Sequence, residues 1–265
     1  MNQPDFIAVN AQDTLQRHKL DSFGALWEME GEQVDEPNIG RGGFSNVTRV
    51  KLKDINGQFR VFYLKRQSNH LIRHWRRPLG EPTVSREFYN IERFARLGIP
   101  AVEASFYAVR REGGERKAIL LTPDLTGYQP LDQWYADWGL HSYRLKQDVL
   151  LAAGRLVASL HDHNIVHNCL YPKHIFIGQV EDGVRARLID LEKSRVYMFS
   201  SRGRLHDLDA LHRHSKPPSR SQRLRFLLHY LNKSRVDADV RYWVTRVLHR
   251  SAAKIAQQNR RKDQG

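Results

Sequence analysis

The chain contains almost no cysteine, and Cys169 is the single one in 265 residues. One thiol excludes a disulfide within the chain and a zinc site built from several cysteines, and it is typical of a reducing compartment. Long apolar runs are also missing. A membrane helix needs roughly 18 such residues, but the most apolar stretch, residues 149–160, contains Arg155. Residues 1–13 have few apolar side chains and lack the basic start of a secretory signal. We therefore expect a cytoplasmic protein that does not span a membrane.

Acidic residues are scarce relative to basic ones. Lys and Arg number 43 and Asp and Glu 29, which leaves a formal net charge of +14. Such an excess attracts anionic partners over long range, and these could be a nucleotide, a nucleic acid or an acidic membrane surface. The hydrophobic content of 40% is sufficient for a core, so the composition excludes a wholly disordered chain.

Strand patterns dominate the first part of the chain. Over residues 47–53 the alternation places Thr48, Val50 and Leu52 on one face of an extended segment. The Asn56-Gly57 pair favours a hairpin turn that leads to a second strand over residues 59–65. The same region is expected to hold a helix and two more strands, over residues 85–97, 105–110 and 117–122.

The pattern becomes helical after Pro123. Apolar residues recur every three or four positions from Leu145 to Leu160, which predicts a helix buried along one face. Short strands at residues 175–177 and 187–189 should pair, and the remainder should be helical. The predicted organisation is a leader, a β-rich lobe, a helical lobe and a basic tail, over residues 1–36, 37–122, 123–250 and 251–265.

Two features of the β-rich lobe indicate phosphate chemistry. Gly40, Gly42 and Gly43 precede the first strand, and their backbone amides could approach a phosphate, although an ordinary flexible turn explains the same glycines. Lys65 ends the next strand, and Glu87 lies 22 residues later in the first turns of the following helix. That spacing allows the lysine and the carboxylate to meet within a small lobe.

The segment at residues 160–177 reads as a helix end, a polar loop and a strand. The partner strand ends at Asp190, whose carboxylate is a hard oxygen ligand of the kind that magnesium prefers, although a turn residue is equally compatible. Asp162, the nearest other carboxylate, is expected to cap the helix end or face solvent.

Taken in order, these motifs resemble the protein kinase fold over about residues 39–211. More narrowly, the sequence resembles the lipopolysaccharide core heptose kinases of the WaaP and InaA type. Residues 171–176 carry this resemblance, with His174 where protein kinases have asparagine, and so do residues 189–191, Ile-Asp-Leu in place of Asp-Phe-Gly. The resemblance implies an α+β, bilobal protein-kinase-like fold with an antiparallel β N-lobe and a mainly helical C-lobe.

The resemblance also implies the nucleotide contacts. ATP would lie under Gly40, Gly42 and Gly43, and Lys65 would hold the α and β phosphates while Glu87 keeps the lysine in place. The acceptor would be a heptose hydroxyl of the lipopolysaccharide inner core, phosphorylated at the cytoplasmic face of the inner membrane.

Further contacts follow from the same resemblance. A hinge at residues 121–125, including Thr122 and Asp124, would receive adenine through backbone groups. Asp190 would hold Mg²⁺ between the phosphates. His174 occupies the second metal position, but an imidazole is a softer ligand than magnesium prefers, so His174 could instead orient the loop.

Cys169 departs from the kinase pattern. Protein kinases have His-Arg-Asp where this chain has His167-Asn168-Cys169, so a thiol replaces the aspartate that accepts the acceptor's proton. The thiol could be a poor substitute, since nearby phosphate disfavours a thiolate. Alternatively, a general base could matter little at this position, because removing the general base of an enzyme typically lowers the rate by only about 10²- to 10⁴-fold. Alternatively the chain is a pseudokinase that binds nucleotide and acts as a scaffold or regulator.

Basic clusters suggest where an anionic partner would bind. Residues 70–78 place three arginines beside Trp75, which would suit a phosphorylated sugar or headgroup, or form a solvated loop. Residues 202–225 would suit lipopolysaccharide or an anionic membrane surface bound peripherally, or only keep the protein soluble. A nucleic-acid-binding function rests on net charge alone, without a reader motif, so we expect no nucleic-acid partner. The sequence has no signature of an oligomeric state.

Overall fold

The computed structural model describes residues 5–262 except 35, 41, 75–76 and 198–199. The chain forms two compact units. The first comprises Met1–Arg96 and Val102–Asp124, and the second comprises Leu97–Ala101 and Leu125–Gly265. The chain thus enters the second unit briefly at Leu97, returns to the first at Val102, and passes to the second for the last time after Asp124.

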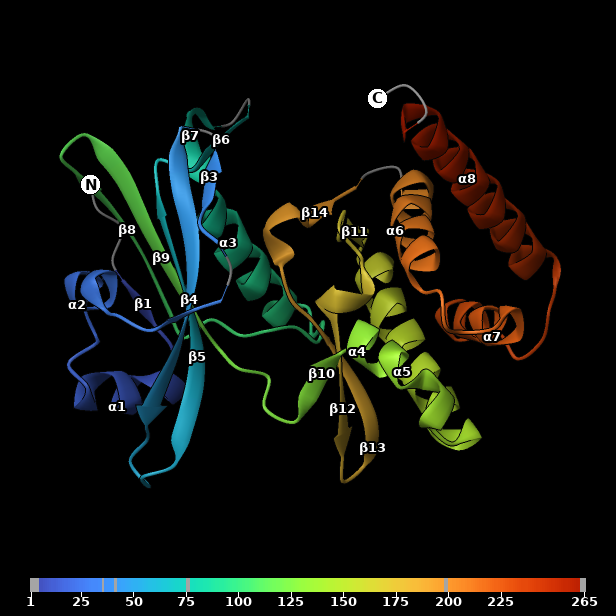
Figure 1. Cartoon of the computed structure of the whole chain (residues 1–265), viewed down its shortest axis with the longest axis horizontal. Helices are drawn as coiled ribbons and strands as arrows, with labels where there is room; N and C mark the ends of the chain where they lie inside the picture. The colour runs from blue at the N-terminus through green and yellow to red at the C-terminus, as the bar shows by residue number, and fades with distance from the viewer. Residues whose placement is uncertain (1–4, 35, 41, 75–76, 198–199, 263–265) are drawn as a thin grey trace. The chain divides into compact units, whose positions relative to one another are not determined.

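An antiparallel sheet forms the first unit (Figure 1). Its strands lie in the order β1 (Phe6–Ile7), β8 (Phe106–Glu112), β9 (Glu115–Pro123), β5 (Phe59–Ser68), β4 (Gly43–Lys53) and β2 (Glu32–Gln33), and β3 (Asn38–Gly40) also pairs with β4. Strands β6 (Leu71–His74) and β7 (Arg77–Pro82) form a separate pair before helix α3 (Thr83–Arg96). The predicted hairpin, the two later strands and the helix are all present.

The alternation of strand β4 places its apolar face on the core, as predicted. Thr48, Val50 and Leu52 are buried, while Lys51 and Lys53 are exposed. Because side chains of a strand point alternately to opposite faces, the seven residues 47–53 were sufficient to assign both faces.

Two helices within the segment expected to be a leader pack onto this sheet. Helices α1 (Val9–Arg17) and α2 (Phe23–Glu28) contribute Ala11, Leu15 and Leu26 to the hydrophobic core of the first unit. The guanidinium of Arg66 on β5 donates hydrogen bonds to the carbonyl oxygens of Trp27 and Met29 at 2.7 and 2.9 Å. The polar composition of residues 1–36 obscured the short apolar stripe that makes this packing possible.

The second unit is mainly helical. Its helices are α4 (Leu131–Ala136), α5 (Tyr143–Asp162), α6 (Ser200–His214), α7 (Arg220–Tyr230) and α8 (Ala238–Lys262), with 3-10 turns η1 (Trp138–Leu140), η2 (Pro172–His174) and η3 (Leu191–Lys193). Strands β10 (Tyr128–Pro130), β12 (Ile175–Val180) and β13 (Gly183–Leu188) form one sheet, and β11 (Ile165–Val166) pairs with β14 (Arg195–Val196). Among the described helices, none is long and apolar enough to cross a bilayer.

Two long-range features fix the helices of the second unit. Gly154 lets α7 approach α5 closely, since an added Cβ would lie 2.9 Å from the His229 Cβ and 3.0 Å from the Phe226 carbonyl oxygen. Helix α8 lies beside α6 (Figure 1), and the hydroxyl of Ser251 donates to Asp209 at 2.6 Å. Residues 251–262, expected to form a tail, are therefore helical and anchored at their start.

Candidate functional site

Lys65 and Glu87 form an ion pair in the first unit. The Lys65 Nζ lies 2.8 Å from the Glu87 Oε2, joining strand β5 to helix α3. The side chains are only 21% and 9% exposed, so this is not a solvent-screened surface pair. The contact that the 22-residue spacing predicted is therefore formed.

The glycine segment is a tight β3–β4 turn in which Gly40 pairs with Gly43. Gly42 has a φ of +80°, a conformation that side chains disfavour. At Gly43 an added Cβ would lie 1.9 Å from the Ser68 carbonyl oxygen. Turn geometry and packing thus require two of the three glycines, whereas Gly40 has only an ordinary contact to the Asn38 side chain at 3.6 Å. The segment also contains position 41, which lies outside the described residues.

The expected hinge is the end of strand β9 and the residues that follow. Thr122 pairs with Tyr63 of β5, and the Asp124 amide donates to the Val61 carbonyl at 2.9 Å. The Leu125 carbonyl accepts from the Tyr128 amide at 2.9 Å. The Leu121 carbonyl accepts from the Ser105 amide at 2.7 Å, so at least three of the backbone groups assigned to adenine are already engaged in this structure.

His174 and Asp190 lie together in the second unit. The Nδ1 atom of His174 is 2.7 Å from the Cys169 carbonyl oxygen, and a carbonyl only accepts, so Nδ1 carries the proton. Its Nε2 lies 3.4 Å from the Asp190 Oδ2. Burial lowers the pKa of His174, because it outweighs the Cys169 hydrogen bond and the charge of Asp190. A neutral Nε2 therefore directs a lone pair towards a carboxylate oxygen.

Asp190 adopts a left-handed backbone conformation, with φ and ψ both 57°, and its side chain is 41% exposed. Such a conformation is uncommon for residues other than glycine and is enriched at functional sites. The Nε2 of His167 is 3.0 Å from the carbonyl oxygen of Ile189, the residue before Asp190. The polar loop therefore holds the segment that carries Asp190.

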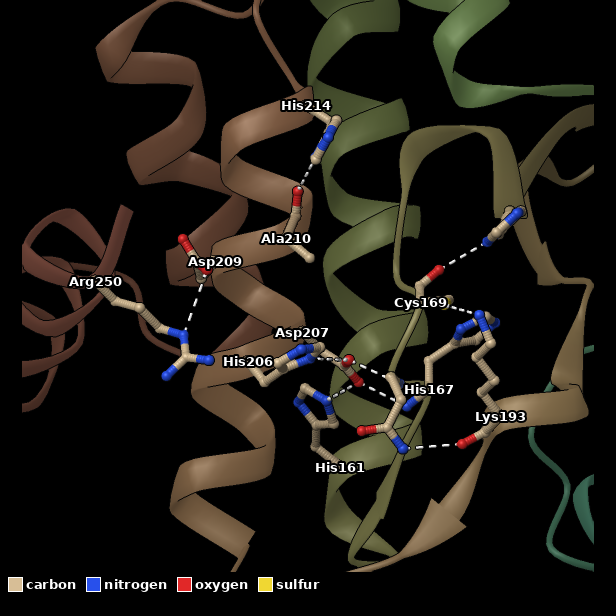
Figure 2. Close-up of polar contacts among 12 residues, drawn as sticks. His161, His167, Cys169, Lys193, His206, Asp207, Asp209, Ala210, His214 and Arg250 are labelled. Carbon is tan, nitrogen blue, oxygen red and sulfur yellow. Dashed lines mark hydrogen bonds and ion pairs between the residues drawn. The ribbon is translucent and has the colours of Figure 1, made fainter. Parts of the chain in front are cut away.

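Lys193 lies beside Cys169 (Figure 2). Its Nζ is 3.4 Å from the Cys169 Sγ, and the Asn168 side chain donates to the Lys193 carbonyl at 2.9 Å. Electrostatic interaction and a hydrogen bond with Cys169 raise the pKa of Lys193, so this side chain is a cation. Sequence reasoning missed this residue, since it lies 24 positions from Cys169.

Asp207 on helix α6 lies beside His167 and anchors the polar loop (Figure 2). It is fully buried and accepts hydrogen bonds from the His167 amide at 2.6 Å and the Asn168 amide at 2.9 Å, and it lies 3.3 Å from the His161 Nε2. Burial alone would raise its pKa, but the contacts of His161 and His206 outweigh burial and hold it below the ordinary value. The sequence did contain a signal for this residue, because Asp207 lies within the apolar stripe of a helix. A charge buried at such a position needs polar partners elsewhere in the fold.

Several expected anion contacts have structural partners instead. In residues 202–225, Arg204 donates to the His161 carbonyl at 2.8 Å, Arg213 pairs with Asp209 at 3.1 Å, and Arg223 donates to the Pro218 carbonyl at 2.9 Å. Arg204 joins α6 to α5, Arg213 pairs within α6, and Arg223 binds the segment before α7, so the region is less available to a membrane or lipopolysaccharide than its sequence indicated.

Two expectations remain, for the basic cluster at residues 70–78 and for Asp162. In the basic cluster, Trp75 and Arg76 lie outside the described residues. Asp162 is 71% exposed, as expected, and lies 3.8 Å from Arg204.

Comparisons with known proteins agree with one another. The model of the lipopolysaccharide kinase (Kdo/WaaP) family matches residues 24–241. Protein InaA of Escherichia coli strain K12 is 33% identical over 201 residues, which cover 75% of this chain and 90% of that protein. A solved structure titled "WaaP in complex with acyl carrier protein" superposes with a TM-score of 0.65 at 20% identity, covering 99% of each chain.

An antiparallel β unit, a helical unit and the match to WaaP together define a protein with a protein-kinase-like fold, as predicted. The chain belongs to the lipopolysaccharide kinase (Kdo/WaaP) family, and its resemblance to the WaaP and InaA type is confirmed. Within the first unit the structure brings Lys65 and Glu87 together. Within the second it brings together Cys169, His174 and Asp190.

Proposed function

We propose that this protein is an ATP-dependent kinase that phosphorylates a heptose hydroxyl of the lipopolysaccharide inner core. The observation that carries the proposal is the Lys65–Glu87 ion pair at 2.8 Å in a member of this kinase family. A partly buried ion pair contributes little net stability compared with apolar residues of the same size. Its presence is therefore better explained by a charged ligand than by the fold.

ATP would be held by groups of the first unit. The Lys65 ammonium would contact the α and β phosphates while Glu87 fixes its position, since an ammonium donates three hydrogen bonds. The backbone amides of Gly40, Gly42 and Gly43 would cover the triphosphate. Adenine would contact the hinge near Thr122 through backbone groups other than the Asp124 amide.

The residues near Asp190 fit one divalent cation. The Asp190 carboxylate is a hard oxygen ligand, and the His174 Nε2 presents a lone pair 3.4 Å from it. Among the described residues no group of three or more His, Cys, Asp or Glu could hold a metal. Phosphate oxygens and water would supply the other ligands of the ion. Mg²⁺ would be bound by Asp190, with His174 as a second ligand or as the residue that orients the loop. The bound ion would neutralise charge on the phosphates.

The Cys169 position would lie at the acceptor hydroxyl. Phosphoryl transfer depends mainly on positioning and electrostatics, so a weak proton acceptor is compatible with slow turnover. The Lys193 ammonium, 3.4 Å from Sγ, would stabilise negative charge that develops there and offset the charge of nearby phosphate. This cation favours an active enzyme over the scaffold alternative.

The test compares Lys65→Ala with Lys51→Ala, a lysine on the solvent face of β4. The Lys65 variant should lose ATP-dependent phosphate transfer to purified core oligosaccharide, while the Lys51 variant keeps the wild-type rate. Circular dichroism checks that both fold. Normal transfer by the Lys65 variant would refute this assignment of the nucleotide site. Mass spectrometry should show that core oligosaccharide from cells without the protein lacks one phosphate group that is present in cells with it.

The alternative is a pseudokinase that acts as a scaffold or regulator in core biosynthesis, which the replacement of aspartate by Cys169 favours. It predicts that the protein binds Mg·ATP but transfers no phosphate to any core acceptor. Failure of Cys169→Asp to restore transfer would favour the scaffold, whereas a gain of activity would favour the kinase.

We also propose two partners. A net charge of +14 supports peripheral binding to an anionic membrane surface. The WaaP structure contains acyl carrier protein, and the second unit of this chain has a mostly apolar cavity of about 620 Å³ lined by residues such as Leu150, Leu211, Phe226 and Val247. That cavity is suited to an apolar chain, so we propose an acyl carrier protein as a partner. Val247→Trp should fill the cavity and weaken capture of acylated carrier in a pull-down, whereas unchanged capture would contradict this role.

A further inference from the structure

Helix α8 has an outward face that is apolar along its centre. Tyr242, Leu248 and Ile255 are 50%, 51% and 49% exposed, and Ala252 and Ala256 between and beyond them are exposed as well. The positions 248, 252, 255 and 256 follow helical spacing, so they form one stripe. Leu248 and Ile255 therefore share the stripe with the two alanines, whereas Tyr242 lies on a different side of the helix, where its ring contacts Arg246.

The opposite face of α8 is fixed to the second unit. Val240 and Val247 are buried, the Ser251 hydroxyl donates to Asp209 at 2.6 Å, and the Arg250 Nε lies 3.3 Å from the same carboxylate. Figure 1 shows α8 beside α6 and α7. The helix is therefore held in one orientation, and its outward stripe is a stable surface.

The helix is strongly basic. After Asp239 it has no acidic residue up to Lys262, and its basic residues are Arg241, Arg246, Arg250, Lys254, Arg260, Arg261 and Lys262. Among those with described side chains, Arg250 alone pairs with a carboxylate. Arg241 and Arg260 are exposed towards the two ends of the stripe. A solvated helix face normally mixes both signs of charge, which this one does not.

We propose that the outward face of α8 is the surface by which this protein binds an anionic lipid bilayer. Leu248 and Ile255 would enter the headgroup region while the flanking arginines contact lipid phosphates, the pattern of helices that lie in the plane of a membrane. A second copy of this chain would present the same basic face and be repelled, which disfavours self-association here. The inference rests on the membrane association proposed above and names the element responsible for it.

Vesicle flotation of the full chain tests the inference, without nucleotide or acceptor. We expect wild-type protein to bind phosphatidylcholine vesicles that contain phosphatidylglycerol but not vesicles of phosphatidylcholine alone. Binding should weaken as the salt concentration rises. Ile255→Gln combined with Arg260→Gln should lower vesicle affinity roughly tenfold, since one removed charge alone accounts for about fivefold. Ile255 is chosen because Leu248 also lines the apolar cavity.

The matched control is Leu140→Gln combined with Arg144→Gln, the same chemical changes at exposed positions elsewhere in the second unit. It should bind vesicles like the wild type, and circular dichroism should show that both variants fold. A second readout uses the single cysteine. In a Cys169→Ser chain, an environment-sensitive dye at Ile255→Cys should shift to the blue on vesicle binding, whereas the dye at Leu140→Cys should not.

The outcomes separate the proposals. Wild-type protein that fails to bind phosphatidylglycerol vesicles would overturn both the membrane association and the role of α8. Wild-type binding with an equally tight Ile255→Gln/Arg260→Gln variant, or a dye at position 255 that does not shift, would overturn the role of α8 alone. Neither result bears on phosphate transfer, which the Lys65 experiment measures independently.

Discussion

The Oδ2 atom of Asp207 lies 2.6 Å from the backbone nitrogen of His167, although the two residues are 40 positions apart. This buried carboxylate on α6 also accepts from the Asn168 amide, so one side chain fixes the backbone immediately before Cys169. The geometry of the candidate site in the second unit therefore depends on a residue that need not touch any ligand.

Removing this carboxylate should destabilise the fold. Asp207→Ala leaves two buried amides and His161 without their acceptor, and we expect the free energy of unfolding to fall by about 3 kcal/mol or more. Urea denaturation measures the change. Asp182→Ala, at a side chain 83% exposed in the β12–β13 turn, is the control and should change stability little. Equal stability of the two variants would contradict the anchoring role.

Stability should depend on pH through His174. Burial holds its folded pKa below the ordinary 6.5, so the unfolded chain takes up the proton first as pH falls. Its contribution is complete above about pH 6.5 and is lost as pH falls through the folded pKa. His174→Asn should reduce the slope of unfolding free energy against pH by at most about 1.4 kcal/mol per pH unit.

The slope should not vanish in this variant, because His212 and His229 also have pKa values lowered by burial. Urea denaturation at several pH values between about 5 and about 7.5 covers the window. A His174 variant with the wild-type slope would show that this imidazole does not titrate as the structure indicates.

Two glycine variants in the β3–β4 turn should distinguish a packing role from a role in ligand binding. Gly43→Ala places a methyl group 1.9 Å from the Ser68 carbonyl, so we expect a loss of about 1–3 kcal/mol in stability. Gly40→Ala has only a contact at 3.6 Å and should fold normally. Thermal unfolding measures both. If Gly40→Ala folds normally but binds ATP more weakly in calorimetry, the turn contacts phosphate, whereas wild-type affinity would restrict it to a structural role.

Lys193 should affect turnover more than substrate binding. Lys193→Gln removes the ammonium beside Cys169, and we expect kcat for phosphate transfer to fall roughly tenfold or more with little change in KM. Lys193→Arg keeps the charge and should retain most of the rate. Lys173→Gln, an exposed lysine of the same loop, is the control. A Lys193→Gln enzyme with the wild-type kcat would remove Lys193 from the mechanism.

Local patterns in the sequence were sufficient for most elements. Alternation assigned the faces of β4, the Asn56-Gly57 pair located its hairpin, and apolar spacing identified α5. The order of motifs gave the kinase-like fold and the Lys65–Glu87 contact. Composition misled at the ends of the chain, where residues judged polar at 1–36 and 251–265 include helices packed on the two units.

The sequence by itself determined most of the strands and helices and the family, because each depends on periodicity or spacing among neighbouring residues. Only the tertiary structure decided that Asp207 holds the loop before Cys169, that Lys193 lies beside its thiol, and that α8 presents a basic, partly apolar face. These relationships depend on which distant side chains share a buried site. Packing sets that arrangement, because a buried charge must find its partners wherever the fold brings them.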